Sequence, residues 1–112
     1  YDLDSINIKT NKTTHYTQTY LDSFLLNHDN VLVYISTTWC TPCRKMEPVI
    51  DRFSKEYISI VKVLKLDLDT HSFLTERYNI QSIPTCVLYK NNTEIWRKNG
   101  IIAYKELGNL FK

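Results

Sequence analysis

Hydrophobic and polar positions divide the chain into short strands and amphipathic helices. Residues 31–35 form an apolar run rich in β-branched and aromatic side chains, which is typical of a buried strand. Beyond this strand, which is predicted over residues 31–36, apolar side chains recur at helical spacing: Met46, Val49, Ile50, Phe53 and Tyr57. The pattern therefore predicts a strand followed by a long helix that ends at about Tyr57. Pro48 lies inside that helix and has no N–H to donate, so we expect a kink there.

The residues before this strand are polar and rich in threonine. Residues 6–9 and 13–17 alternate like two short strands, which indicates an edge hairpin. Residues 20–25 then carry one apolar stripe at helical spacing. We expect Thr17 or Thr19 to cap this first helix.

Later segments predict a strand over 60–68 and a short helix over 70–77 that is capped by Thr70. Residues 83–89 and 93–98 are expected to form two strands joined by a tight turn at Asn91 and Asn92. Asn99-Gly100 breaks the second strand, and a final helix has an apolar face made of Tyr104, Leu107, Leu110 and Phe111. The predicted order is β-α-β-α-β-α-β-β-α, with parallel strands first and an antiparallel hairpin at the end.

Length and charge narrow the classes of protein. The chain has 112 residues, and we assign 1–112 to a single domain in which 1–12 are an N-terminal extension or an edge strand. The net charge is +2 and no basic run occurs, which argues against a nucleic-acid partner. No apolar stretch is as long as a membrane span. Because the sequence begins at Tyr1 rather than Met, we expect trimming, a cloned fragment or a removed signal segment.

Two cysteines lie where the buried strand gives way to the long helix. This places Cys40 at a helix N-terminus, where unpaired N–H groups and the helix dipole favour an anion. A thiolate is such an anion, so Cys40 is expected to be acidic and nucleophilic. Arg44 and Lys45 add positive charge beside it. A Cys-x-x-Cys pair with Cys43 in this context indicates a redox site.

Two other interpretations of the pair stay open. A structural zinc site needs four ligands, whereas the chain adds one further cysteine, Cys86, and three scattered histidines, His15, His28 and His71. A purely structural disulfide between Cys40 and Cys43 would close a very short loop and would gain little loop-closure entropy. We therefore expect no metal, and we expect Cys86 to face the core as a small hydrophobic residue.

The whole pattern resembles the thioredoxin family from about Thr13 onward. The resemblance rests on Trp39-Cys-Thr-Pro-Cys43, on Pro48 in the helix, and on Ile83-Pro84-Thr85, with Pro84 placed 84 − 43 = 41 residues after Cys43. Lys65 and Gly100 match two further family positions. The resemblance implies the thioredoxin fold, an α/β architecture with a central mixed β-sheet flanked by helices in three layers, α/β/α.

The resemblance also implies roles for these residues. Cys40 would attack a substrate disulfide and Cys43 would resolve the mixed disulfide, so the pair itself carries electrons and no cofactor is needed. Trp39 would pack beside the pair, while Thr41 and Pro42 tune it from within the motif. Pro84 would be cis and expose backbone to an extended substrate, and three neighbours would line the same groove: Ile83, Thr85 and Gly100.

The chain departs from the family at three positions. Tyr34 stands where most thioredoxins bury an aspartate below the second cysteine, and with an ordinary pKa of about 10 a tyrosine is a poor base. Resolution would then be slower, or would rely on water or on Lys65. Thr41 replaces the usual glycine, and Ser36 replaces a tryptophan found in many thioredoxins.

These observations lead to three hypotheses of function. The first is a thiol–disulfide oxidoreductase that reduces protein disulfides, acting as a monomer and re-reduced by a thioredoxin-reductase-like or membrane electron donor. The second is an extracytoplasmic oxidase or a reductase with dedicated clients, and the third is a non-catalytic thioredoxin-fold binding module. The first hypothesis favours the cytoplasm, whereas the second places the protein outside it after a signal or anchor is removed.

Overall fold

The computed structural model describes residues 17–112. The edge hairpin predicted for 6–9 and 13–17 lies outside these residues, apart from Thr17. Helix α2 (Gln18–Asn27) has Thr17 as its N-cap, and the hydroxyl of Thr17 accepts the N–H of Tyr20 at 3.0 Å. Of the two predicted caps, Thr17 is therefore the one used.

Four strands form one mixed sheet. They are β1 (Asn30–Ser36), β2 (Lys62–Asp67), β3 (Thr85–Lys90) and β4 (Thr93–Asn99), in the spatial order β2-β1-β3-β4. β1 runs parallel to β2 and antiparallel to β3, and β3 is antiparallel to β4. The central position of β1 explains its continuous apolar run, because a strand covered on both faces has no solvent side.

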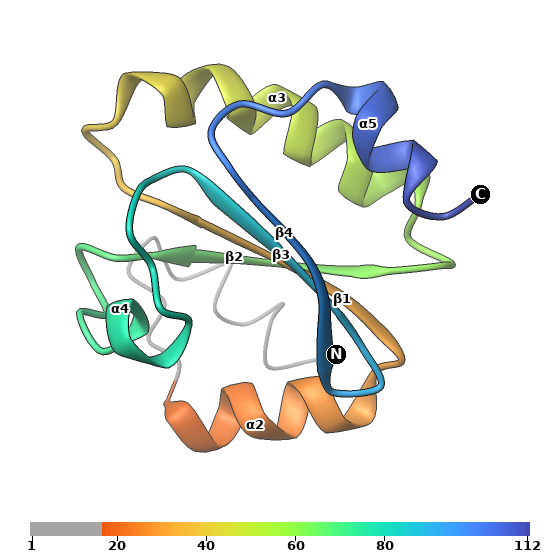
Figure 1. Cartoon of the computed structure of the whole chain (residues 1–112), viewed down its shortest axis with the longest axis horizontal. Coiled ribbons are helices and arrows are strands. Elements are labelled where there is room, and N and C mark those ends of the chain that lie inside the picture. The colour runs from red at the N-terminus through yellow and green to blue at the C-terminus, as the bar shows by residue number, and fades with distance from the viewer. Residues whose placement is uncertain (1–16) are drawn as a thin grey trace.

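Helices cover both faces of this sheet (Figure 1). α3 (Thr41–Glu56) and α5 (Tyr104–Asn109) lie on one face, and α2 and α4 (Leu74–Arg77) lie on the other. Each face has its own hydrophobic core, one around Phe24, Val33 and Leu74 and one around Met46 and Phe53. The predicted three-layer arrangement around a mixed sheet is therefore confirmed.

α3 continues without a break through Pro48 and ends one residue before Tyr57, close to its predicted end. At the turn between β3 and β4, Asn91 and Asn92 have φ angles of 50° and 67°, which an asparagine tolerates better than most residues. Gly100, which follows β4, has a φ of 92°. The predicted turn at Asn91 and Asn92 is thus present, and the second strand of the hairpin ends before Gly100, as predicted.

Two helix bounds differ from the prediction. The helix expected over 70–77 begins at Leu74, and its N-cap is Phe73 without a side-chain hydrogen bond, so Thr70 does not cap it. The N–H groups of Thr70 and His71 both donate to the carbonyl of Asp67, which commits this segment to a turn. The last helix ends at Asn109, and the apolar side chains that follow it, Leu110 and Phe111, still pack on the core of the α3 face.

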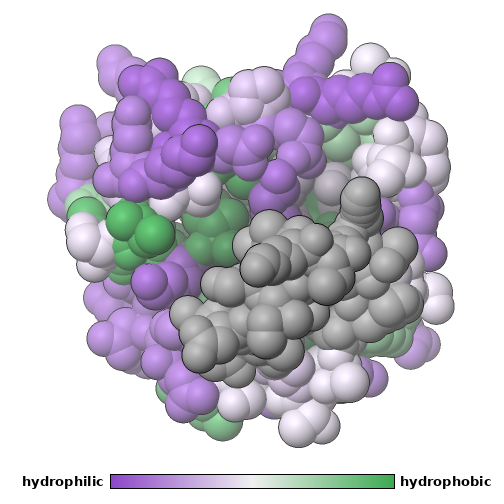
Figure 2. All heavy atoms as spheres, turned by 180° about the vertical axis from the view of Figure 1, so that it is seen from behind, coloured by the Kyte–Doolittle hydropathy of each residue, from purple (hydrophilic) through white to green (hydrophobic). Residues whose placement is uncertain are grey.

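Hydrophilic residues form much of the upper surface when the molecule is seen from behind (Figure 2). This is the side on which α3 and α5 lie, so the amphipathic pattern of α3 places its polar face toward solvent. None of the helices within residues 17–112 is both long enough and apolar enough to cross a membrane.

Candidate active site

The cysteine pair lies at the junction of β1 and α3. Cys40 is the N-cap of α3, and its Sγ accepts the N–H of Cys43 at 3.2 Å. Pro42 lies in the first turn, where a residue without an N–H costs the helix nothing. Cys40 and Cys43 form a disulfide with a Cα–Cα distance of 5.2 Å, and they are 5% and 1% exposed. Thr41 between them faces solvent. The local sequence thus aims a backbone donor at the sulfur of Cys40.

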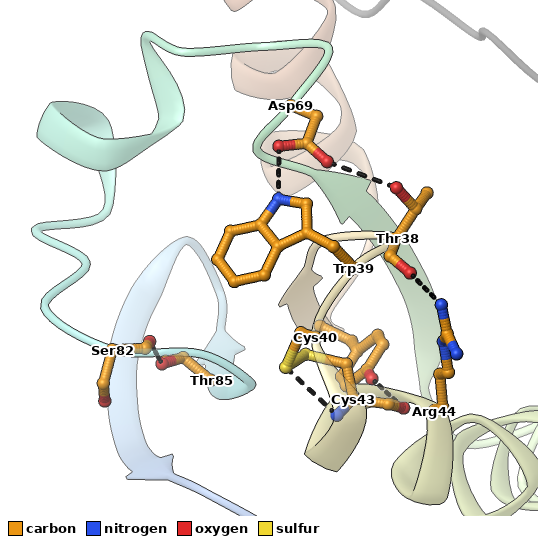
Figure 3. The surroundings of a disulfide bond; sticks show 9 residues. Thr38, Trp39, Cys40, Cys43, Arg44, Asp69, Ser82 and Thr85 are labelled. Atoms are coloured by element: carbon orange, nitrogen blue, oxygen red, sulfur yellow. Dashed lines mark hydrogen bonds between the residues drawn. A yellow bond between two sulfur atoms is a disulfide. The ribbon is translucent and has the colours of Figure 1, made fainter.

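Trp39 forms an exposed rim beside the pair (Figure 3). Its Nε1 donates to Oδ1 of Asp69 at 3.1 Å, and the hydroxyl of Thr38 lies 3.4 Å from Oδ2 of the same carboxylate. On the other side, the guanidinium of Arg44 donates to the carbonyl of Thr38 at 3.2 Å. The loop before Cys40 is therefore held by Asp69 from the loop after β2 and by Arg44 from α3. Arg44 thus anchors this loop in addition to carrying a positive charge.

Asp69 is a residue of this site that the sequence reasoning missed. It follows the carboxyl end of β2, which is parallel to β1, and the loops after parallel neighbours meet at one edge of a sheet. The predicted parallel pairing of these two strands was therefore the signal that could have pointed to Asp69.

The loop before β3 lies across from the sulfur atoms (Figure 3). The Ile83–Pro84 peptide bond is cis, and the carbonyl of Pro84 accepts the N–H of Gly100 at 2.7 Å. A Cβ at Gly100 would meet no atom within 4 Å, so the space above this residue is open. Ile83 is half-buried. The structure therefore brings Pro84 and Gly100 together, and the shared groove stays a prediction.

Thr85 lies beside this loop but turns its side chain inward. The residue is fully buried, and its Oγ1 lies 2.5 Å from the carbonyl of Ser82 and 2.8 Å from Oδ1 of Asn99. Its hydroxyl is thus engaged within the protein, so Thr85 supports the loop rather than offering a side chain to a ligand.

A cavity of about 370 Å³ opens beneath Cys43. Lys65 reaches it from β2, and its Nζ lies 2.6 Å from Oε1 of Glu47 and 2.9 Å from Oδ1 of Asp51. Burial by itself lowers the pKa of this ammonium, but the hydrogen bonds to the two carboxylates outweigh it and raise the pKa overall. Lys65 is therefore a fixed positive charge near the pair.

Tyr34 stands under the second cysteine, at the predicted place. Its side chain is fully buried, and its hydroxyl donates to the carbonyl of Cys43 at 3.1 Å. Burial raises the pKa of Tyr34 well above its ordinary value, and the charge of Glu47 raises it further. Tyr34 is thus a neutral hydrogen-bond donor at neutral pH and not a base.

A second, more apolar hollow of about 260 Å³ adjoins Trp39. Its lining combines the rim with the loop before β3 and includes Trp39, Leu68, Ile80 and Ile83. An apolar hollow beside the Trp39 rim offers a place for a side chain of an approaching protein.

The remaining cysteine is buried in β3. Cys86 is 1% exposed and lies opposite Tyr34 in the pairing of β1 with β3. Burial raises the pKa of its thiol to about 12, so it is unreactive in the folded protein. Within residues 17–112, no group of three or more His, Cys, Asp or Glu side chains is arranged to hold a metal ion.

Comparison with known proteins places this geometry in a family. The thioredoxin family model matches residues 12–112. A thioredoxin of Rickettsia bellii is 42% identical over 80 residues, which cover 66% of this chain and 76% of that protein. A thioredoxin-like protein of Synechocystis sp. is 38% identical over 82 residues, which cover 73% of this chain and 75% of that protein.

Solved structures agree. A thioredoxin of Plasmodium falciparum superposes with a TM-score of 0.75 at 32% identity, covering 83% of this chain and 89% of that one. A mutant thioredoxin from Halobacterium salinarum superposes with a TM-score of 0.77 at 29% identity, covering 84% of this chain and 81% of that one. Both the match and the Trp-Cys-x-x-Cys arrangement are those of a redox-active dithiol that acts on protein disulfides. The chain belongs to the thioredoxin family and is a thiol–disulfide oxidoreductase.

Proposed function

We propose that this protein reduces protein disulfides, with Cys40 as the nucleophile and Cys43 as the resolving residue. The observation that carries the proposal is the backbone N–H of Cys43, which points at Sγ of Cys40 from 3.2 Å at the start of α3. An N–H donor and the positive end of a helix stabilise a thiolate more than a thiol. Cys40 is also the more exposed of the two sulfur-bearing residues.

The reaction has two exchange steps. The Cys40 thiolate attacks one sulfur of a client disulfide, so a mixed disulfide forms and the first client thiolate leaves. Cys43 then loses its proton and attacks Sγ of Cys40, which releases the second client thiolate. Two electrons pass to the client, and the pair ends as the Cys40–Cys43 disulfide described above. The pair itself carries the electrons, so the proposal includes no cofactor.

The client would lie against the loops that surround the pair. The loop between Ser82 and Thr85 lies across from Cys40, and Ile83 and Trp39 border an apolar hollow of about 260 Å³. An extended client segment placed here would present its disulfide to the sulfur while one side chain fills the hollow.

A reductant of this kind needs an electron donor and a reducing compartment. We propose a thioredoxin-reductase-like donor and a cytoplasmic location, with the protein acting as a monomer. The buried free thiol of Cys86 supports a reducing compartment, although burial also protects it elsewhere. A membrane electron donor and an extracytoplasmic location are the alternative.

Tyr34 is the observation that favours the second candidate function, an oxidase or a reductase with dedicated clients. It fills the place of the buried aspartate with a neutral hydroxyl that binds the carbonyl of Cys43. A different environment of the resolving cysteine changes the rate and the potential of the pair.

Reduction of insulin disulfides tests the proposal. Cys40→Ser removes the nucleophile and is expected to abolish the activity. Cys43→Ser keeps the first step and is expected to accumulate a mixed disulfide with insulin, visible by mass spectrometry. Cys86→Ser is the matched control, since this thiol is buried, and it should react like the wild type. Retained activity in Cys40→Ser would contradict the role of Cys40 as the nucleophile, whereas a wild type that reduces no insulin would favour a binding module.

A further inference from the structure

The cavity beneath Cys43 raises the question of where the proton of this thiol goes. Under the proposed function, on which this inference rests, Cys43 must become a thiolate before it attacks Sγ of Cys40. Cys43 is 1% exposed, so bulk water has little access to it. A group that takes the proton would therefore have to lie in the cavity that Cys43 lines.

Two of the neighbouring groups are poor proton acceptors. Tyr34 touches Cys43 through its hydroxyl, but burial keeps that hydroxyl protonated at neutral pH. Lys65 also lines the cavity, and its hydrogen bonds to two carboxylates keep it protonated. Tyr34 thus supplies a hydrogen bond and Lys65 a positive charge, which leaves the carboxylates of the cavity as the candidate acceptors among its ionisable groups.

Two carboxylates line the cavity, Glu47 and Asp67. Oδ1 of Asp67 accepts the N–H of Asp69 at 2.8 Å and so closes the turn after β2. Glu47 lies four residues after Cys43 in α3, which places both side chains on the same face of the helix, one turn apart. Glu47 is also the carboxylate whose charge acts on Tyr34, the residue that binds the carbonyl of Cys43.

We propose that Glu47, held by Lys65, is the group that accepts the proton of the Cys43 thiol during resolution. Its Oε1 lies 2.6 Å from Nζ of Lys65, and its side chain is half-buried beside the cavity. The carboxylate that the family buries in the central strand is here supplied by the helix instead, while Tyr34 fills the vacated position.

The step balances as follows. The proton moves from Sγ of Cys43 to the Glu47 carboxylate, and the new thiolate attacks Sγ of Cys40. The bond between Cys40 and the client sulfur breaks, its electron pair leaves with the client thiolate, and the proton passes on to that thiolate or to solvent.

Charged and titratable groups from three elements surround Glu47, and each would affect the pH dependence of the step. They are Arg44 and Asp51 from α3, Lys65 and Asp67 from β2, and Tyr34 from β1. Because Lys65 binds both Glu47 and Asp51, a loss of either carboxylate removes one partner of the ammonium. Asp51 is therefore the matched control for effects that act through Lys65.

Stopped-flow reaction of the reduced protein with dithiobis(nitrobenzoate) separates the two steps. Attack by Cys40 releases one coloured thiolate, and resolution by Cys43 releases the second. Glu47→Gln is expected to keep the first phase and to slow the second by about tenfold or more at neutral pH. The deficit should narrow at alkaline pH, where hydroxide replaces the carboxylate. Glu47→Asp should restore most of the second phase.

The controls decide between this proposal and its competitors. Asp51→Asn and Asp67→Asn should leave the second phase within about twofold of the wild type, a difference small beside general-base effects. An unchanged second phase in Glu47→Gln overturns the proposal, as does an equal loss in Asp51→Asn or a larger loss in Asp67→Asn. A wild type that releases no coloured thiolate contradicts the proposed function itself, so the two failures differ.

Discussion

At the scale of single residues, the chemistry of the pair depends on what touches Cys40 and Cys43. A backbone N–H reaches the first sulfur, and a buried phenol binds the carbonyl of the second residue. The rim is set by Trp39, whose indole is fixed by Asp69. Each of these contacts makes a separate, measurable contribution.

Removal of the Tyr34 hydroxyl should lower stability modestly. Tyr34→Phe loses the hydrogen bond to the carbonyl of Cys43 but keeps the ring that fills the core. A neutral hydrogen bond contributes about 0.5 to 1.5 kcal/mol net, and we expect this loss in the free energy of unfolding. Urea unfolding of the oxidised protein measures it. A loss above about 3 kcal/mol would mean that the phenol does more than bind this carbonyl.

Asp69 should affect clients more than small disulfides. Asp69→Ala frees the Trp39 indole, which we expect to slow insulin reduction by less than about tenfold, because one such hydrogen bond is worth about 1 kcal/mol. Attack of Cys40 on a small aromatic disulfide should stay unchanged. Fluorescence anisotropy of Trp39 in a Trp96→Phe background reports the freed ring. Equal slowing of both substrates would contradict a role in client positioning.

At the scale of elements, the active site depends on how α3 is held against the sheet and against α5. Tyr57, at the end of α3, packs on Phe53, Tyr104 and Phe111. Its hydroxyl lies 2.6 Å from the place where a Cβ on Gly108 of α5 would be. A larger side chain at position 108 would therefore force the Tyr57 ring to move.

Gly108→Ala should destabilise the protein by about 1 to 3 kcal/mol, because overpacking displaces a ring that its neighbours hold. Tyr57→Phe removes the clashing oxygen. In that background the same substitution should be neutral or slightly stabilising, since alanine favours a helix over glycine by up to about 1 kcal/mol. Urea unfolding of the four proteins forms a double-mutant cycle. Equal effects in both backgrounds would contradict this packing.

At the scale of the whole molecule, one buried cysteine and three buried or half-buried tyrosines stay neutral in the folded protein at an alkaline pH at which the same side chains ionise in the unfolded chain. Burial raises the pKa values of Cys86 and Tyr89 to about 12, and it also raises those of Tyr34 and Tyr78. Ordinary values are about 8.5 for cysteine and about 10 for tyrosine. As pH rises, the unfolded chain therefore loses these protons first.

The free energy of unfolding should accordingly keep its full value below about pH 8.5. It should fall as the pH rises toward 12, by up to about 1.4 kcal/mol per pH unit for each group. Urea unfolding of the oxidised protein at about pH 7, 9 and 10.5 tests this, because the Cys40–Cys43 disulfide does not titrate. Cys86→Ala should flatten the decline below pH 10. Stability that stays constant or rises up to pH 10.5 would contradict the account.

Much of this molecule followed from its sequence because the signals were local. The apolar run of β1, the helical spacing of α3 and the asparagine pair between β3 and β4 each specify an element without distant contacts. Thr70 was wrong as a cap because the segment after β2 forms a turn and the helix begins only at Leu74, a competition that propensity alone does not resolve.

The parts of the site that the sequence missed depend on tertiary contacts. Asp69 contacts Trp39 across 30 positions of the chain, and Glu47 contacts the predicted Lys65 across 18. The order of the strands in the sheet, not the spacing along the chain, decides which of these residues come into contact. Glu47 alone had a local signal, since it lies one helical turn after Cys43.

The reduction potential of the Cys40–Cys43 pair is the most direct test of the central claim, that the protein reduces protein disulfides. Equilibration of the full chain in dithiothreitol and glutathione buffers, followed by thiol labelling and mass spectrometry, gives this potential. The account predicts a value near about −270 mV, the value known for thioredoxin itself. A value near about −120 mV, that of the strong oxidant DsbA, would contradict it and would make the protein an oxidant of its clients.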